Sequence, residues 1–267
     1  MKIVVFDLDE TLGYFVEFGI FWDSLSLYLN KELNQQDFNN LMDLYPEFLR
    51  PNIINILNYL KNKKITTNCQ KIMIYTNNQG SRKWTNHIIS YFESKINYYK
   101  LFDQLICAFK INGKQVEFCR TTNNKTYKDF IRCTKLPMNA EICYLDDSFY
   151  PEMVNDNIYY INIKPYTHCI PFDEICKRFL ESNSLLSKKE NNDDFKDFIN
   201  KQIKMYNFSV IQKTKQDYEI DKILSKKIMI HLEDFFNKNN YSNKNKTCKK
   251  YHTYNKIKNK SSKNNKK

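Results

Sequence analysis

The sequence predicts an α/β fold with a doubly wound, Rossmann-like parallel sheet, and two observations support this class. First, three short apolar runs each end in a polar residue: residues 3–6 before Asp7, 72–75 before Thr76 and 142–145 before Asp146. Continuous apolar runs of this length are typical of strands buried on both faces. Second, segments with helical spacing lie between the runs, and this alternation predicts right-handed crossovers. In such a fold the active site lies at the carboxyl ends of the strands.

The remaining elements follow from the same patterns. Residues 105–109 and 158–163 are two further apolar runs and are predicted strands. Pro51 suits the first turn of a helix, because apolar residues recur after it at helical spacing. Further helices are predicted from apolar stripes within residues 84–92, 130–131, 195–203 and 220–236.

Three parts are expected along the chain: an α/β domain (1–181), a helical extension (182–236) that includes a polar linker at 191–194, and a tail (237–267). The tail is rich in Asn and Lys and has too little apolar content for a core, so we expect it to be disordered. It holds 11 lysines and no acidic residue, which leaves 31 of the 42 basic residues against 30 acidic ones in the remainder. The body is therefore nearly neutral, and contact with nucleic acid or another polyanion is expected through the tail.

The segment between the first and second predicted strands is short and largely helical, so no large cap domain is expected. Phe18, Phe21 and Trp22 form either a flap over the site or the core of a small insert within residues 14–48. An open site suits macromolecular substrates, which a cap cannot enclose.

Composition excludes several classes. No apolar run reaches the length of a membrane span, and Asp7 comes too early for a signal peptide. We therefore expect an intracellular protein, cytoplasmic or nuclear, without a membrane partner. The eight cysteines show neither a CxxC pair nor Cys/His ligand spacing, so neither a disulfide nor a zinc site is expected.

The segment 6–12 (FDLDETL) holds the most informative motif. Asp7 and Asp9 follow the first predicted strand and, two residues apart, face the same side of an extended chain. Paired carboxylates at a strand end suit Mg²⁺ and phosphoryl chemistry, in which one Asp attacks phosphorus and the other transfers a proton. Taken alone, the motif equally fits an acidic turn that caps the following helix.

The motif has partners at the other strand ends. Asp146 and Asp147 can complete a metal site, and the Thr76 hydroxyl with the Asn77 N–H can bind phosphate oxygens. The predicted metal-binding residues are Asp7, Asp9, Asp146 and Asp147.

A lysine is also needed, because carboxylates and phosphate repel one another. Lys125 and Lys128 compete for this role. Thr126 and Asp129 fit a capping box, which places Lys125 just before a helix and Lys128 within its first turn. We favour Lys125 as a catalytic and phosphate-binding residue, with Lys128 as the alternative. Arg120 is either a further phosphate contact or a surface residue.

This pattern resembles the haloacid dehalogenase-like superfamily of phosphatases over residues 1–180. DLDETL, with Leu49-Arg50-Pro51 at the start of a helix, looks most like the branch of RNA polymerase II C-terminal-domain phosphatases and NLI-interacting factors. The resemblance implies Asp7 as nucleophile and Asp9 as general acid/base. It further implies Mg²⁺ held by Asp7, the Asp9 carbonyl and Asp147.

Under the same resemblance, Asp146 orients Lys125 or a metal-bound water. The branch commonly carries Asp-Asn where this chain has Asp146-Asp147. The segment 76–80 (TNNQG) is also similar to the Thr-Asn-Gln-x-Gly segment of polynucleotide 3′-phosphatases and histidinol-phosphate phosphatases. Asn/Lys/Ile/Tyr-rich usage fits an AT-rich genome, and similar proteins occur in large DNA viruses.

The function that the resemblance implies is a Mg²⁺-dependent phosphatase with an aspartyl-phosphate intermediate. Its expected substrate is a phosphorylated macromolecule, foremost a phosphoserine or phosphothreonine protein. A polynucleotide 3′-phosphatase or a small-metabolite phosphatase is the alternative within enzymes. A non-catalytic interaction protein, whose helices at 195–236 bind a partner, is the alternative from another class, and the intact acidic cluster argues against it.

Overall fold

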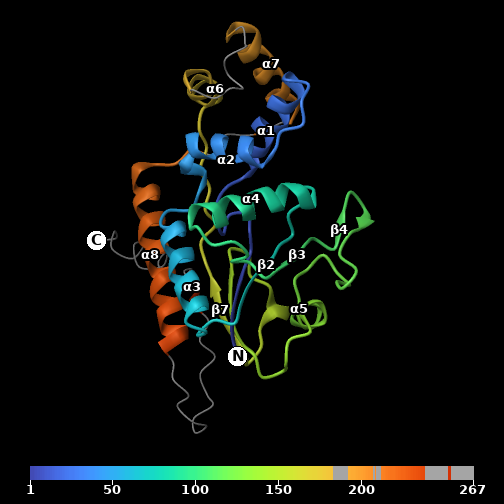
Figure 1. Ribbon diagram of the computed structural model, residues 1–267, viewed down its shortest axis with the longest axis vertical. Coiled ribbons are helices and arrows are strands. Elements are labelled where there is room, and N and C mark those ends of the chain that lie inside the picture. The colour runs from blue at the N-terminus through green and yellow to red at the C-terminus, as the bar shows by residue number, and fades with distance from the viewer. Residues whose placement is uncertain (183–191, 207, 209–211, 238–251, 254–267) are drawn as a thin grey trace, which may run out of the picture.

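An all-parallel sheet, with five main strands and a sixth of two residues at one edge, lies at the centre of the molecule and confirms the predicted α/β class (Figure 1). The computed structural model describes residues 1–182, 192–206, 208, 212–237 and 252–253. The main strands are β1 (Lys2–Phe6), β2 (Lys71–Tyr75), β3 (Gln104–Ile106), β6 (Glu141–Asp146) and β7 (Ile158–Asn162). Their order is β3-β2-β1-β6-β7, so β1 is central and the chain reverses direction across the sheet after β3. All five match apolar runs in the sequence.

Helices cover both faces of the sheet. Successive residues of β1 point to opposite faces, as strand geometry requires. Val4 and Phe6 belong to a large core that also holds residues of seven helices, whereas Ile3 and Val5 pack in a smaller core with Phe130. Three of the seven are α3 (Ile53–Ile65), α4 (Arg82–Lys95) and α8 (Lys215–Asn237), and Phe130 lies on α5 (Tyr127–Thr134).

A layer of four helices lies at the end of the sheet toward which β1 runs (Figure 1). Phe18 and Phe21 are fully buried within it, so these residues form the core of an insert rather than a flap. The members of the layer are α1 (Val16–Tyr28), α2 (Gln35–Leu44), α6 (Phe172–Glu181) and α7 (Asn192–Met205). The sequence predicted no large cap domain between the first two strands. The structure places the insert, α1 and α2, in one layer with α6 and α7, which come after β7 in the chain.

The helical extension packs on the body at two places. Phe195 and Phe198 of α7 lie against Tyr28 of α1, with ring centroids 5.2 Å apart in both pairs. α8 packs along α3 and β7, and Lys2 Nζ donates to the carbonyl oxygen of Phe235. The polar residues 192–194, predicted as linker, instead form the first turn of α7, where acidic side chains are favoured by the helix dipole.

The remaining elements are two or three residues long. Residues 252–253 pair with β7 as a short parallel strand, and the rest of the tail predicted to be disordered, from 238 onward, lies outside the described residues. This strand is β8 (His252–Thr253), and the other short elements are η1 (Pro46–Phe48), η2 (Pro151–Met153), β4 (Lys110–Ile111) and β5 (Lys114–Gln115).

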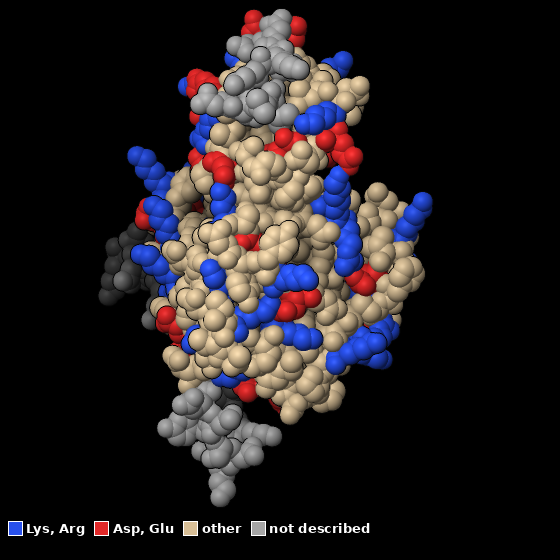
Figure 2. Space-filling model, in the orientation of Figure 1, with Lys and Arg blue, Asp and Glu red and all other residues tan. Residues whose placement is uncertain are grey.

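The surface agrees with a nearly neutral body. On the face shown in Figure 2, basic and acidic side chains are interspersed rather than gathered by sign. Among the described residues, no helix combines the length and the apolar composition needed to cross a membrane.

The expectation of no disulfide is wrong. Cys119 and Cys133 are joined, with their Cα atoms 5.0 Å apart. Their spacing of 14 residues matches no cysteine motif, and the two thiols meet because the loop before α5 folds back onto that helix. Arg132 Nε supports this approach by donating to the carbonyl oxygen of Cys119.

Candidate active site

Three adjacent strand ends bring the predicted residues together. Asp7 follows β1, Thr76 follows β2, and Asp146 is the last residue of β6. Since β2 and β6 flank β1 in parallel register, their carboxyl ends meet at one edge of the sheet. This edge is also where the strand order reverses, the place at which open α/β sheets bind ligands.

A lysine lies between two of the carboxylates. Lys125 Nζ is 2.5 Å from Asp7 Oδ1 and 2.7 Å from Asp146 Oδ2. The side chains of Lys125 and Asp146 are 1% exposed, and that of Asp7 is 10% exposed. The ammonium also lies over the rings of Tyr75 and Tyr150. A charge buried this deeply is tolerated only with such partners.

The local sequence explains how Lys125 reaches this position. Thr126 is the N-cap of α5, as predicted, and its hydroxyl accepts from Asp129 N at 3.0 Å. The reciprocal half of the capping box is absent, because the Asp129 carboxylate instead accepts from the backbone and hydroxyl of Thr121. Lys125 therefore points back toward the strand ends, whereas Lys128 is exposed.

Asp7, Asp146 and Asp147 could hold a metal ion. Each offers a carboxylate oxygen, and the three oxygens lie within 4.8 Å of one another. Hard oxygen donors at this separation suit Mg²⁺, and the single lysine leaves the cluster with excess negative charge. The donor set therefore fits a divalent cation. The Asp9 carboxylate, also predicted for the metal, is not part of this set.

The two residues of the acidic pair have different surroundings. Asp146 Oδ2 accepts from Lys125 and from the Tyr144 hydroxyl, and its Oδ1 accepts from Ser148 N at 2.8 Å. Asp147 Oδ1 accepts a longer bond, 3.2 Å, from the Thr11 hydroxyl, and the residue is partly exposed. Asp147 thus keeps more capacity for a further ligand than Asp146.

Burial dominates the electrostatics of these carboxylates. It raises the pKa of Asp7 to about 6, against the lowering effect of Lys125. The pKa values of Asp9 and Asp146 are also raised to about 6, chiefly by burial. For Lys125, burial favours the neutral amine, but the charges of Asp146 and Asp7 outweigh it and raise the pKa above its usual value. The lysine is therefore a cation.

A second hydrogen-bonded group holds Asp9. Asn78 Nδ2 donates to Asp9 Oδ2 at 2.7 Å, and Asn78 N donates to the Thr76 hydroxyl at 3.0 Å. Asn77 Nδ2 donates to the Tyr150 hydroxyl at 3.1 Å. Asn78 was not among the predicted residues, although it lies in the segment 76–80 that the sequence singled out.

Arg50 anchors the turn that carries the acidic motif. Its guanidinium is 1% exposed and donates to the carbonyl oxygens of Thr11, Glu10 and Lys164. Glu10 has φ of 56°, a left-handed conformation that costs energy for a residue with a side chain. Arg50 offsets this cost and fixes the path from Asp7 to α1. The sequence indicated only that Arg50 precedes Pro51 at the start of a helix, and it did not predict this anchoring role.

Arg120 has a similar anchoring role at the neighbouring strand end. It is 1% exposed and donates to the carbonyl oxygens of Thr76 and Cys107, at 3.1 and 2.8 Å, and to those of Asn123 and Asn124. Arg120 is thus neither a phosphate contact nor a surface residue. It joins the end of β2 to the loop that carries Lys125.

Fold and site together define an α/β protein with a buried carboxylate–lysine cluster at the carboxyl edge of a parallel sheet. Comparison with models of known protein families, with curated proteins and with solved structures found no match for this chain.

Proposed function

We propose that this protein is a Mg²⁺-dependent phosphatase of the haloacid dehalogenase type that forms an aspartyl-phosphate on Asp7. One observation supports this above all: the Asp7 carboxylate lies 2.5 Å from a buried cation, in a cluster whose donor atoms suit a divalent ion. A site that excludes most water strengthens such charge interactions. Two buried carboxylates and a partly exposed one share a single lysine, and without a further cation their remaining charges would repel one another, which argues against an idle scaffold.

The proposed reaction has two steps. Asp7 attacks phosphorus, the bond from phosphorus to the leaving oxygen breaks, and Asp9 gives its proton to that oxygen. Asp9 then takes a proton from a water molecule, which attacks the phosphorus of the aspartyl-phosphate. The bond from phosphorus to the Asp7 oxygen breaks, inorganic phosphate leaves and the Asp7 carboxylate is restored. Asn78 supports this assignment because its side-chain amide fixes the orientation of Asp9.

The phosphoryl group is proposed to bind between Lys125, the Thr76 hydroxyl and the Asn77 N–H. Lys125 offsets the charge that would otherwise repel phosphate from Asp7. Asp7, Asp147 and the Asp9 carbonyl would hold Mg²⁺, with Asp146 orienting Lys125 through the bond of 2.7 Å. When bound, the ion supplies Lewis-acid polarisation of the phosphoryl oxygens.

Parallel assays test the proposal. We expect the protein to hydrolyse p-nitrophenyl phosphate with Mg²⁺, and the comparison of phosphoserine peptides with 3′-phosphorylated oligonucleotides identifies the macromolecular substrate. Asp7→Asn should fold normally and lose nearly all turnover, because an amide does not attack phosphorus. Asp156→Asn, an exposed change before β7, is the matched control. Wild-type turnover by Asp7→Asn on every ester would refute the mechanism.

A further inference from the structure

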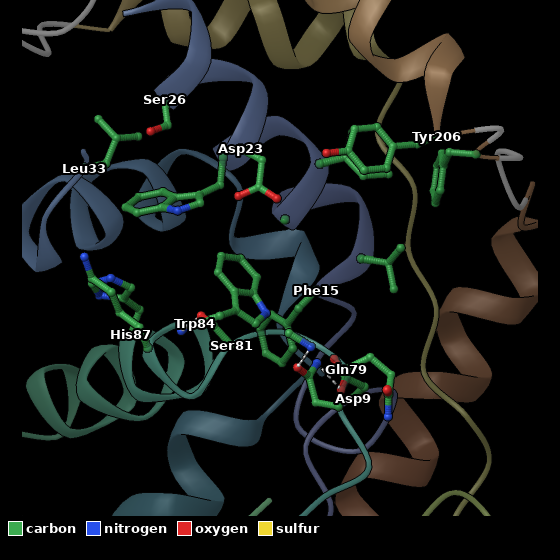
Figure 3. Close-up of a pocket in the computed structure, with 18 of the residues that line it drawn as sticks. Asp9, Phe15, Asp23, Ser26, Leu33, Gln79, Ser81, Trp84, His87 and Tyr206 are labelled. Atoms are coloured by element: carbon green, nitrogen blue, oxygen red, sulfur yellow. Dashed lines mark hydrogen bonds between the residues drawn. The ribbon is translucent and has the colours of Figure 1, made fainter. Parts of the chain in front are cut away.

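A cavity of about 800 Å³ opens beside Asp9, between the edge of the sheet and the layer of helices. In Figure 3, Asp9 lies at one end of it, near Gln79, and Tyr206 lies on the opposite side. Since Asp9 is proposed to protonate the leaving oxygen, the group bonded to that oxygen leaves on this side. The cavity is therefore the space available to the leaving group. The residues that line it determine which leaving groups bind, and so which class of substrate the protein accepts.

Aromatic side chains form much of the wall: Phe15, Trp22, Trp84, Tyr206 and Phe208. Trp84 is held by packing, with its ring centroid 5.5 Å from that of Phe38 and 6.0 Å from that of Phe18. Gly19 makes room for it, because a Cβ there would lie 3.3 Å from the indole. The wall is thus formed before any substrate binds, which reduces the entropy lost on binding.

The charges in the cavity are mainly negative. Lys83 and Glu32 both line it, but they form an ion pair with each other and their charges cancel. Asp23 points into the cavity (Figure 3), and within the part of the chain that the structure describes its carboxylate has no ion pair and no hydrogen bond. Burial raises the pKa of Asp23, without an opposing cation. Asp9 accepts from Asn78 and carries the proton that it is proposed to donate, so Asp23 remains as the uncompensated carboxylate of the cavity.

We propose that this cavity binds a cationic group, an ammonium or a guanidinium, carried by the leaving group of the phosphate ester. Aromatic faces together with a carboxylate attract such cations, and quaternary ammonium groups are recognised in this way. A polyanionic leaving group, such as the rest of an oligonucleotide, would bring further phosphates toward Asp23 and be repelled. The inference rests on the proposed phosphatase activity and narrows its substrate class.

One pair of phosphate esters separates the effect of positive charge on the leaving group from the effect of its shape. Phosphocholine and 3,3-dimethylbutyl phosphate have nearly the same shape, and differ by a quaternary nitrogen in place of a quaternary carbon. We expect kcat/KM to be about tenfold or more higher for phosphocholine, the usual strength of a cation held by aromatic rings in a partly desolvated site. A second pair of substrates tests the same charge on a peptide: phosphoserine peptides that carry either lysine or norleucine at the positions after the phosphoserine. The pair of substrates with the larger ratio of kcat/KM values identifies whether the cation belongs to a small molecule or to a peptide.

Two variants connect the preference to the cavity. Asp23→Asn removes the carboxylate charge, and Trp84→Leu removes one aromatic wall. Each should reduce the ratio of the two kcat/KM values severalfold, whereas Asp156→Asn, at the other end of the sheet, should leave the ratio as in the wild type. Circular dichroism establishes whether the variants are folded. If Trp84→Leu does not fold, Asp23→Asn alone tests the connection between the cavity and the preference.

A binding measurement separates this inference from the proposed function. Both tryptophans of the chain line the cavity, so their fluorescence reports on it directly. Choline should change that fluorescence at lower concentration than 3,3-dimethylbutanol, and Asp23→Asn should remove the difference. Hydrolysis of p-nitrophenyl phosphate without any preference for the cationic ester or for choline would overturn the inference and leave the phosphatase intact. Choline binding without hydrolysis of any ester would instead overturn the proposed function.

Discussion

Lys125 and Asp7 form a buried ion pair that joins the loop before α5 to the end of β1, with Nζ 2.5 Å from Oδ1. The two residues are 118 positions apart in sequence. The cation is thereby fixed where an approaching phosphate would otherwise meet carboxylates alone. In the proposed reaction, it neutralises charge at the nucleophile before and during the transfer.

Lys125→Ala should lower kcat/KM for p-nitrophenyl phosphate by about 100-fold or more, the usual loss when a charge-stabilising donor is removed. Lys128→Ala should stay within about twofold of the wild type, because Lys128 is exposed and away from the carboxylates. Thermal melting of both variants serves as the folding control, since Lys125→Ala leaves two buried carboxylates without their cation. Equal and mild losses would mean that neither lysine binds the phosphate.

A chelator should abolish turnover, and added Mg²⁺ should restore it. Asp147→Ala should raise the Mg²⁺ concentration needed for half-maximal activity more than Asp146→Ala does. The reason is that Asp146 already accepts bonds from Lys125, Tyr144 and Ser148. Titration of activity against Mg²⁺ provides the measurement. The opposite order would exchange the two roles, direct ligand and positioning residue.

Glu17 predicts a pH dependence of stability that is independent of catalysis. Its carboxylate is fully buried in α1, and one oxygen accepts from Ile170 N while the other has no partner among the described residues. Burial raises the pKa of Glu17 to about 7 from 4.5. The folded protein therefore binds this proton more tightly than the unfolded chain, and ionisation destabilises the fold as pH rises from about 5 to above 7.

Glu17→Gln removes that ionisation and keeps an oxygen for Ile170 N. The variant should gain up to about 3 kcal/mol of unfolding free energy relative to the wild type at pH 8, and much less at pH 5. Urea denaturation at both values measures the difference. A gain that is the same at pH 5 and pH 8 would show that Glu17 does not titrate in this range.

Removal of the residues after Asn237 should leave turnover on p-nitrophenyl phosphate unchanged, because the cut preserves α8 and its contact with Lys2. Salt-sensitive binding to RNA or DNA should be lost with the 11 lysines of the tail. In the full chain, log affinity should fall with log salt by up to roughly 0.7 to 0.9 per phosphate contacted. Equal binding by both chains would make the tail a solubilising segment. A collapse of turnover would show that the tail supports the catalytic body.

Much of the fold was predictable because it follows from local periodicity. The run before Asp7 and the run before Asp146 each identify a strand without any knowledge of the rest of the chain, whereas their pairing in the sheet is known only from the structure. Lys125 was placed by the N-cap that follows it, another local signal. These features depend on residues within one or two turns of each other, so a single sequence shows them.

The anchoring residues were not predictable for the opposite reason. Arg50 and Arg120 bind carbonyl oxygens, which every residue has, so no partner can be recognised in the sequence. The Cys119–Cys133 pair and the packing of α7 on α1 depend equally on the tertiary path. Such contacts arise from the folded chain as a whole rather than from a local pattern.

The pairing of α1 with α7 has a consequence for biosynthesis. A ribosome delivers α1 soon after β1, whereas Phe195 and Phe198 emerge only after the five main strands of the sheet have been made. Until then Tyr28 and the aromatic residues near it lack the rings that cover them in the finished protein. The nascent chain thus carries a complete acidic motif beneath an uncovered apolar surface, the kind of surface that chaperones bind. The helical layer is therefore completed late in synthesis, after the catalytic edge of the sheet has been made.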